Sequence, residues 1–171
     1  MRHKKLDGLS PNALKREYLK NGILPKWHSK TLKEFTNDSN AKSKVEKYLK
    51  DAYLMKQKGI GLFLWGANGT GKTHLMTSAF KLLLEEGHSA KVISLSSLIA
   101  KFTAGWYDAT EKRELQDILK KVEFLGIEEI GKEFRSKNSD LGTVVFDNIL
   151  RYRVQMQKPT WFTSNVNPKN L

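Results

Sequence analysis

The sequence predicts an α/β protein in which a parallel sheet is flanked by helices in three layers. Three observations support this prediction. Apolar strand-like segments alternate with helical segments, a glycine-rich turn joins the first strand to the next helix, and polar residues end three of the strands. Right-handed crossovers between parallel strands bring those strand ends to one edge of the sheet, where ligands bind in such folds.

Size and composition limit the classes of protein to consider. A chain of 171 residues fits one domain, and the absence of cysteine excludes disulfides and thiolate zinc sites. No apolar run reaches membrane-spanning length and no signal-like segment follows the basic start, so we expect a cytoplasmic protein with no membrane association. The net charge of +12 favours a polyanionic partner, although charge that serves only solubility would give the same number.

Residues 1–22 form a short N-terminal segment with one predicted helix. Ser10 is placed as its N-cap, Pro11 as its first residue and Asn21-Gly22 as its stop. Leu14, Tyr18 and Leu19 share one face of this helix. The face suits either packing as a satellite of the domain or docking on a partner.

Residues 23–171 are predicted to form the main domain. They open with an extended connector around Pro25, which disfavours helix at the residue before it. A single amphipathic helix with a lysine-rich outer face is expected over residues 41–58. Its apolar positions are Val45, Tyr48, Leu49, Ala52 and Met55.

A phosphate-binding loop follows a short buried strand at residues 62–65. Residues 66–73 match G-x-x-x-x-G-K-[ST], and a helix begins directly afterwards. Glycines allow the backbone N–H groups to converge on a phosphate, Lys72 supplies a positive charge and the Thr73 hydroxyl suits Mg²⁺. A chance glycine-rich turn is the alternative. The predicted nucleotide contacts are Gly66, Ala67, Asn68, Gly69, Thr70, Gly71, Lys72, Thr73 and His74.

The rest of the chain alternates between strands and helices. Ser96 or Ser97 is expected to cap a short helix, and Asp108 opens a capping box with Glu111. Strands are expected at residues 90–95, 122–127 and 160–164, and helices at 98–102, 108–121 and 140–157. In the last helix the residues predicted to face inward are Val144, Val145, Ile149 and Tyr152, and Trp65 and Trp161 are predicted to lie in the core.

Two acids and an asparagine end the later strands. Glu128 stands where a nucleoside triphosphatase needs an acid for Mg²⁺, and Glu129 where a general base would polarise the attacking water. The Asn165 side chain is suited either to positioning that water or to contacting the γ-phosphate. The alternatives are acids without a catalytic task and a plain turn asparagine. We predict Lys72, Glu129 and Asn165 as catalytic residues, and Thr73 and Glu128 as metal ligands.

Arginines and exposed aromatic residues supply further candidates. Arg135, Arg151 and Arg153 are candidates for an arginine acting in trans on a neighbouring subunit, or are ordinary surface residues. Between the second and third strands, aromatic residues beside a lysine suit stacking of unpaired bases, or packing on the adjacent helix. These candidate nucleic-acid contacts are Lys101, Phe102, Trp106 and Tyr107.

Three segments together resemble the DnaC/DnaI-type replicative helicase loaders, which are AAA+ P-loop ATPases. They are Gly-Ala-Asn-Gly-Thr-Gly-Lys-Thr from Gly66, Phe-Leu-Gly-Ile-Glu-Glu from Phe124 and Thr-Trp-Phe-Thr-Ser-Asn from Thr160, which resemble Walker A, Walker B and sensor 1. The IstB-like transposition ATPases share most of this pattern.

The resemblance implies ATP and Mg²⁺ as cofactors, and a homo-oligomer that engages a replicative helicase and single-stranded DNA. The family usually has aspartate at the position of Glu128, which implies weaker Mg²⁺ binding or hydrolysis. The chain stops after sensor 1, so we expect a fragment without the C-terminal lid. The leading hypothesis is a helicase loader, the alternative is a nucleotide-gated adaptor or transposition helper with little turnover, and a small-molecule kinase comes third.

Overall fold

The computed structural model describes residue 6, residues 8–131 and residues 139–170. Within them, four parallel strands form one sheet in the order β1-β4-β3-β2. The strands are β1 (Phe63–Trp65), β2 (Ala90–Ser94), β3 (Phe124–Ile130) and β4 (Thr160–Ser164). The predicted α/β class with a parallel sheet is confirmed.

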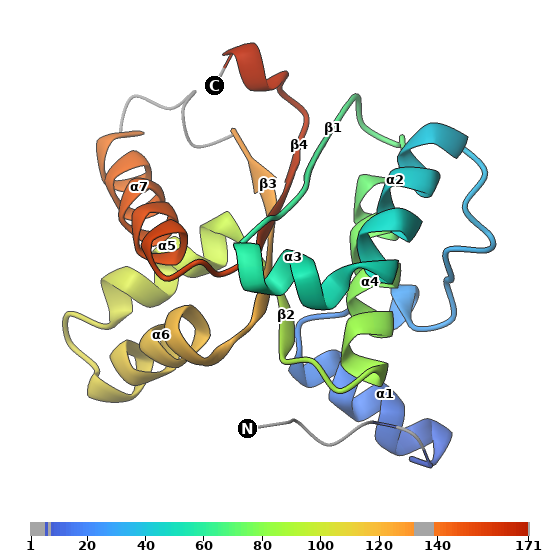
Figure 1. Ribbon diagram of the computed structural model, residues 1–171. Helices are drawn as coiled ribbons and strands as arrows, with labels where there is room; N and C mark the ends of the chain where they lie inside the picture. The colour runs from blue at the N-terminus through green and yellow to red at the C-terminus, as the bar shows by residue number, and fades with distance from the viewer. Residues whose placement is uncertain (1–5, 7, 132–138, 171) are drawn as a thin grey trace.

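Helices cover both faces of the sheet, which gives three layers (Figure 1). On one face lie α1 (Pro11–Lys20), α2 (Ser39–Lys50), α3 (Ala52–Lys58) and α4 (Lys72–Glu85), and on the other α5 (Leu95–Ala104), α6 (Ala109–Lys121) and α7 (Ser139–Gln155). Two short 3₁₀ turns, η1 (Pro25–Trp27) and η3 (Pro168–Asn170), complete the described elements. None of the helices in this part of the chain is both long and apolar enough to cross a bilayer.

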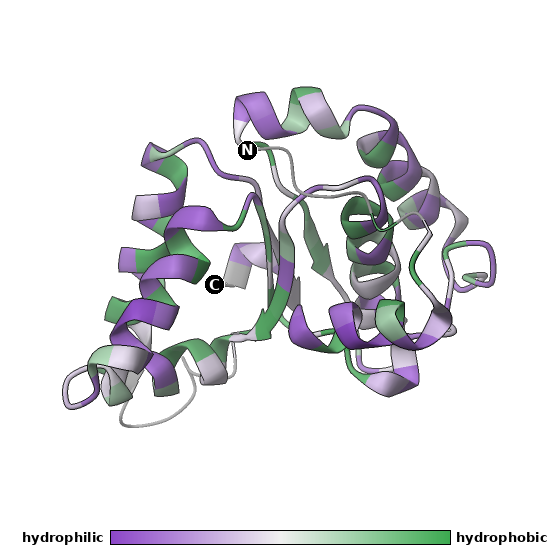
Figure 2. Cartoon of the chain, turned by 90° about the horizontal axis from the view of Figure 1, so that it is seen from below, coloured by the Kyte–Doolittle hydropathy of each residue, from purple (hydrophilic) through white to green (hydrophobic). Residues whose placement is uncertain are grey.

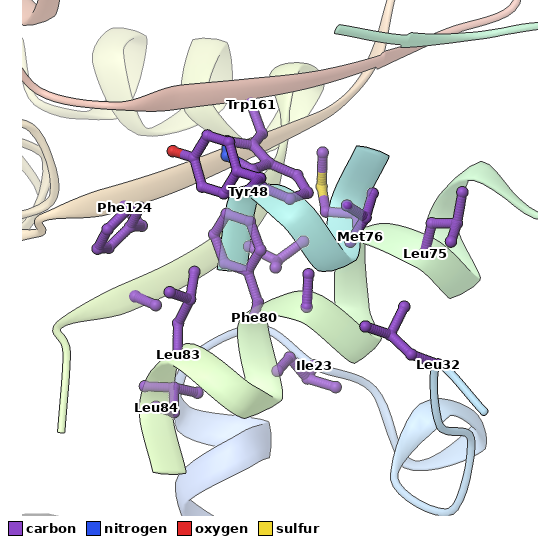
Figure 3. Close-up of a cluster of buried hydrophobic side chains, with 14 of the residues drawn as sticks. Ile23, Leu32, Tyr48, Leu75, Met76, Phe80, Leu83, Leu84, Phe124 and Trp161 are labelled. Carbon is purple, nitrogen blue, oxygen red and sulfur yellow. The ribbon is translucent and has the colours of Figure 1, made fainter. Parts of the chain in front are cut away.

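Each face of the sheet has its own hydrophobic cluster. The strands and the nearby sides of the helices are largely hydrophobic, and the outer turns are largely hydrophilic (Figure 2). One cluster lies between the sheet and helices α2 and α4. In it, the Tyr48 ring packs edge-on against Trp161 with 4.8 Å between ring centroids, and the Phe80 ring packs against the same indole with 5.5 Å between centroids (Figure 3). Trp161 is therefore a core residue, as predicted.

Helix α1 begins and ends as predicted, with Ser10 accepting from the Ala13 N–H and Asn21 as C-cap. Tyr18 is buried, but the Leu19 side chain is 52 % exposed, so only part of the predicted apolar face packs against the domain. The Asn21 carbonyl accepts a hydrogen bond from the Val92 N–H at 2.9 Å. The segment after α1 therefore lies along the outer edge of β2.

The prediction of a single helix over residues 41–58 is wrong. The structure has two helices, α2 and α3, which break at Asp51 with φ −103° and ψ 20°. Aspartate is a poor residue for a helix interior because its side chain competes for backbone hydrogen bonds. Residues from both helices, Tyr48 and Ala52 among them, remain in the same core cluster.

Four other local predictions are corrected. Ser94, not Ser96 or Ser97, caps α5, because its hydroxyl accepts from the Ser97 N–H and helix begins at Leu95. Trp65 is 54 % exposed, because β1 is short and lies at the edge of the described sheet. Val144 is also 54 % exposed, whereas Val145 and Ile149 are buried as predicted. Asp108 caps α6 as predicted, through the Thr110 N–H, but the predicted capping box is not formed, because the Asp108 N–H donates to the Ala104 carbonyl and Glu111 pairs with Lys101. The bounds of β4 are as predicted.

Helix α4 packs very closely on the sheet at Gly126 in β3. A Cβ atom added there would lie 2.8 Å from the Met76 sulfur and 3.0 Å from the Phe80 ring. A larger residue would push α4 away. This close contact holds the middle of α4 against β3.

Candidate nucleotide-binding site

A cavity of about 210 Å³ opens at the carboxyl ends of the strands, beside the loop that joins β1 to α4. This edge lies at the top of the molecule in Figure 1. Residues from the glycine-rich loop, β3, the end of β4 and the connector meet there. The lining residues are Trp27, Asn68, Gly69, Gly71, Lys72, Thr73, Glu129, Thr163, Ser164 and Asn165.

Glycine is needed in the loop for conformational reasons. Gly69 and Gly71 have φ of +80° and +88°, in the left-handed region that other residues rarely adopt. Gly71 is also the N-cap of α4, so the helix begins at the cavity. The free N–H groups and the positive end of the helix dipole favour an anion at this position.

Lys72 lies folded back on its own loop. Its Nζ atom donates hydrogen bonds to the carbonyl oxygens of Gly66 at 2.8 Å and Ala67 at 2.7 Å. Burial lowers the pKa of Lys72, and the charge of Glu129 opposes that shift. The ammonium thus stands at the cavity, held by loop carbonyls and close to a carboxylate.

Glu128 approaches Thr73 from β3. Burial raises the pKa of Glu128, the charge of Glu129 adds to this shift, and a hydrogen bond with Thr73 opposes it. The Oε1 atom of Glu128 is buried and has no hydrogen-bond partner among the described residues. A buried carboxylate oxygen without a donor, next to a threonine hydroxyl, is a suitable donor set for a hard divalent cation. No group of three or more possible metal-binding side chains occurs in the described ranges.

Glu129 reaches the cavity because β3 is irregular. The pairing of β3 with β4 shifts register between Ile127 and Ile130, and Glu129 has φ +61°. In a regular strand Glu128 and Glu129 would point to opposite faces of the sheet, whereas a bulge redirects one of them. The Glu129 N–H donates to the Thr163 hydroxyl at 3.0 Å, which ties this irregular backbone to β4.

Asn165 follows β4 directly and lines the same cavity, with an exposed side chain. The residue before it is fixed, because the Ser164 hydroxyl donates to the Ile130 carbonyl at 2.8 Å and accepts from the Val166 N–H at 2.9 Å. The ends of β3 and β4 are thus joined where Asn165 emerges. The structure brings together all three predicted catalytic residues, Lys72, Glu129 and Asn165.

The connector supplies a wall of the cavity that sequence reasoning missed. Trp27 lines the cavity and stacks on His74, with 6.1 Å between ring centroids. His74 itself faces the connector: its Nε2 atom lies 2.9 Å from the Thr31 carbonyl, and its ring packs edge-on against Phe35. His74 is not among the residues that line the cavity, and its predicted contact with nucleotide stays a prediction.

A second, larger groove of about 550 Å³ adjoins the loop on the side of β1. Gly66, Thr70 and Lys72 belong to it, so it continues from the phosphate loop. Exposed Trp65 lies on one wall and the beginning of α2 on another, including Lys44. All loop residues from Gly66 to Thr73 except Ala67 line one of the two spaces, and the Ala67 carbonyl holds Lys72.

Arg153 cannot act in trans in this structure, which corrects that prediction. Its side chain is fully buried and donates five hydrogen bonds, to the Thr160 hydroxyl and to four carbonyl oxygens. The carbonyls belong to Leu119, Val122, Glu123 and Pro159. Arg151 is exposed and pairs with Asp147 at 2.6 Å, and Arg135 lies outside the described residues.

The predicted nucleic-acid contacts lie on α5 and the turn after it. Trp106 and Tyr107 are 59 % and 91 % exposed, and Phe102 packs edge-on against Trp106. Lys101, however, is held by two carboxylates, Glu111 at 2.8 Å and Glu114 at 2.7 Å. Its charge is thus largely neutralised. This site keeps exposed aromatic surface but lacks the free lysine that the prediction required.

A glycine loop between a strand and a helix, with acids and an asparagine from neighbouring strands around one cavity, defines a P-loop nucleoside triphosphatase fold. Comparison with known proteins places the chain within that class. It belongs to the bacterial DnaA ATPase domain family, because the sequence model of that family matches residues 31–171.

A curated relative supports the same assignment. The chain is 30 % identical over 127 residues to the replicative helicase loader DnaI of Bacillus subtilis (strain 168). The match covers 74 % of this chain and 40 % of DnaI, so the chain spans well under half of that relative. The resemblance to helicase loaders stated from the three motifs is confirmed.

Solved structures share the AAA+ fold. The DnaC helicase loader superposes with a TM-score of 0.73 at 19 % identity, covering 84 % of this chain and 81 % of DnaC. A crystal structure of DnaI gives a TM-score of 0.66 at 25 % identity, covering 91 % of this chain and 74 % of the DnaI chain. The structure of replication initiator DnaA bound to AMPPCP and single-stranded DNA gives a TM-score of 0.67 at 23 % identity. This match covers 86 % of this chain and 44 % of DnaA.

Proposed function

We propose that this chain is the ATPase core of a helicase loader, in which ATP binding and hydrolysis control assembly with a replicative helicase on single-stranded DNA. The observation that carries the proposal is the meeting of Lys72, Thr73, Glu129 and Asn165 around one cavity, with Glu128 beside Thr73. Each residue type suits one task of phosphoryl transfer. The setting we infer is the cytoplasm.

Phosphate binding rests on the loop and on Lys72. The N–H groups at the start of α4 receive the phosphate oxygens, and the ammonium turns from the carbonyls of Gly66 and Ala67 to the β- and γ-phosphates. A Mg²⁺ ion held by Thr73 and Glu128 would neutralise phosphate charge. The unpartnered Oε1 atom of Glu128 is the feature that fits it.

Hydrolysis rests on Glu129 and Asn165. The Glu129 carboxylate accepts a proton from the water that attacks the γ-phosphorus, while the bond to the leaving β–γ bridging oxygen breaks. Asn165 orients the same water or the γ-phosphate. The hydrogen bond from the Glu129 N–H to Thr163 keeps the base at the end of β4, where Asn165 stands.

The nucleoside part of the ligand is assigned to the groove beside β1. This groove continues from Gly66, Thr70 and Lys72, and it contains the aromatic residues Phe35 and Trp65. An aromatic and largely apolar groove suits a nucleobase. ATP is therefore expected to extend from the phosphate cavity toward the start of α2.

The proposed partners are inferred from the relatives of this chain. DnaI carries the name of a replicative helicase loader, and the DnaA neighbour was solved with single-stranded DNA. We assign the ATPase core to residues 23–171 and a satellite or partner-binding role to residues 1–22, and we expect ATP-dependent homo-oligomers. A nucleotide-gated adaptor or transposition helper that binds ATP with little turnover remains the alternative.

Phosphate release in the presence of helicase and single-stranded DNA tests the proposal. Glu129→Gln should lower the release rate at least a hundredfold while nucleotide binding stays intact. Glu46→Gln, an exposed glutamate on α2, is the matched control and should leave the rate unchanged. Equal rates for Glu129→Gln and wild type would remove Glu129 from catalysis, and nucleotide binding with negligible wild-type turnover would identify the adaptor.

A further inference from the structure

The connector before α2 brings a second lysine close to the nucleotide cavity. Lys26 and Trp27 are consecutive residues of the 3₁₀ turn η1. Trp27 lines the cavity, and the Nζ atom of Lys26 lies over the same indole, 4.7 Å from the centroid of its ring. This distance is typical of a cation–π contact. The Lys26 ammonium therefore stands beside a wall of the cavity.

Helix α4 holds this turn in place. The buried Lys81 ammonium donates hydrogen bonds to the carbonyl oxygens of Trp27 and His28, both at 2.9 Å. The Ser78 hydroxyl donates to the Lys30 carbonyl at 3.3 Å. Since α4 also begins at the phosphate loop, the turn and the loop are attached to the same helix. The position of the turn relative to the cavity is thus fixed by named contacts.

Two carboxylates at the site oppose one lining lysine. Among the described residues that line the cavity, Lys72 is the cation and Glu129 the acid, and Glu128 adds a second carboxylate beside Thr73. Burial raises the pKa of Glu128, and the charge of Lys26 is one of the effects that oppose this shift. Lys26 is therefore within electrostatic reach of the acids. A further cation at this place would favour a highly charged anion.

The Lys26 side chain is able to turn toward a ligand. It is exposed, and beyond its contact with Trp27 it forms no ion pair or hydrogen bond with any described residue. Lysine carries three rotatable donors on a flexible stem. The ammonium can therefore exchange the indole for a phosphate oxygen without breaking an ion pair.

The position of the turn indicates which phosphate is involved. The nucleoside is assigned to the groove beside β1, and Lys72 borders both that groove and the cavity. The phosphates then run from the groove past Lys72 into the cavity, so the terminal phosphate lies farthest from the nucleoside. Trp27 lines the cavity but not the groove. Lys26, beside Trp27, is thus close to the phosphate that ATP has and ADP lacks.

We propose that Lys26 binds the γ-phosphate of ATP and makes the site prefer ATP to ADP. A charge-assisted hydrogen bond to phosphate is stronger than an exposed cation–π contact, so the ammonium leaves the Trp27 ring when the triphosphate binds. The inference rests on the proposed function. It adds to the loop and strand ends a residue of the connector that distinguishes substrate from product.

The test is displacement of a fluorescent ADP analogue from the chain by AMPPCP or by ADP, each with Mg²⁺. AMPPCP keeps three phosphates but has a methylene group in place of the β–γ bridging oxygen, so it is not hydrolysed. Lys26→Met should weaken AMPPCP binding about tenfold and ADP binding less than about twofold, because one charged hydrogen bond to the γ-phosphate is lost. Lys26→Arg should retain most of the preference for AMPPCP.

The matched control is Lys33→Met, which removes the same charge from another exposed position of the connector. It should bind both nucleotides as wild type does, and each variant should melt near the wild-type temperature without ligand. Wild-type AMPPCP affinity in Lys26→Met would overturn the inference. Equal losses of AMPPCP and ADP affinity would also overturn it, because Lys26 would then not distinguish the γ-phosphate. If wild type bound neither nucleotide, the proposed function would fail and the inference with it.

Discussion

The Nζ atom of Lys72 donates a hydrogen bond to the carbonyl oxygen of Gly66 at 2.8 Å, across the phosphate loop. The same atom also holds the Ala67 carbonyl. The ammonium that we assign to the phosphates therefore already stabilises the shape of the loop. Phosphate must replace these two acceptors, so nucleotide binding and loop conformation are coupled through one side chain.

Glu128→Gln should stabilise the protein at neutral pH when no Mg²⁺ is present. Burial raises the native pKa of Glu128 above the ordinary 4.5, so the native state disfavours the charged carboxylate. That cost is absent below pH 4.5 and complete above the native pKa. The variant should thus melt higher than wild type at pH 7, with the difference vanishing as the pH falls to 4.

The same substitution should have the opposite effect on ligand binding. Glutamine lacks the charge that suits Mg²⁺, so the increase in melting temperature given by Mg²⁺-ATP should be smaller than in wild type. Thermal melts at pH 4, 5.5 and 7, with and without Mg²⁺-ATP, measure both effects. A lower melting temperature at pH 7 without ligand would contradict the assignment of a buried carboxylate whose Oε1 atom has no hydrogen-bond partner among the described residues.

Arg153→Met should destabilise the fold by about 3 kcal/mol or more, because four carbonyls and the Thr160 hydroxyl lose their donor in a buried place. Arg153→Lys should recover little, since an ammonium cannot reach acceptors arranged around a planar guanidinium. Arg151→Ala, on the exposed surface of the same helix, is the control and should leave the urea midpoint nearly unchanged. Similar midpoints for Arg153→Met and Arg151→Ala would mean that Arg153 has no structural role.

Lys81→Met should loosen the connector that carries Trp27. The Lys81 ammonium is buried and donates to the carbonyls of Trp27, His28 and Lys30. Methionine fills similar volume but leaves these acceptors unpaired, at a cost of about 2 kcal/mol. Urea denaturation measures this loss, and hydrogen exchange of residues 24–31 should become faster. Unchanged exchange would show that Lys81 does not hold the connector.

Much of the site was predictable because its signals are local. The spacing of Gly66, Gly71, Lys72 and Thr73 defines the loop, and the polar ends of β3 and β4 follow from alternating strands and helices. The sequence also predicted that these ends meet. That inference needs only parallel strands, which the apolar patterns already indicated.

The features that were missed depend on contacts between distant residues. Nothing near Arg153 in the sequence indicates burial, because the carbonyls that surround it come from α6 and from the segments just before β3 and β4. Trp27 reaches the cavity only through the path of the connector across α4. The bulge that brings Glu129 to the cavity depends on pairing with β4, which a strand pattern cannot reveal.

The central claim is tested most directly by equilibrium binding of a fluorescent ATP analogue to wild type and Lys72→Ala, with and without Mg²⁺. We predict that wild type binds in the presence of Mg²⁺ and that Lys72→Ala binds at least about a hundredfold more weakly, while both melt at nearly the same temperature. Lys120→Ala, an exposed lysine on α6, should bind like wild type. Equal affinity of Lys72→Ala and wild type would contradict the assignment of this cavity as the nucleotide site.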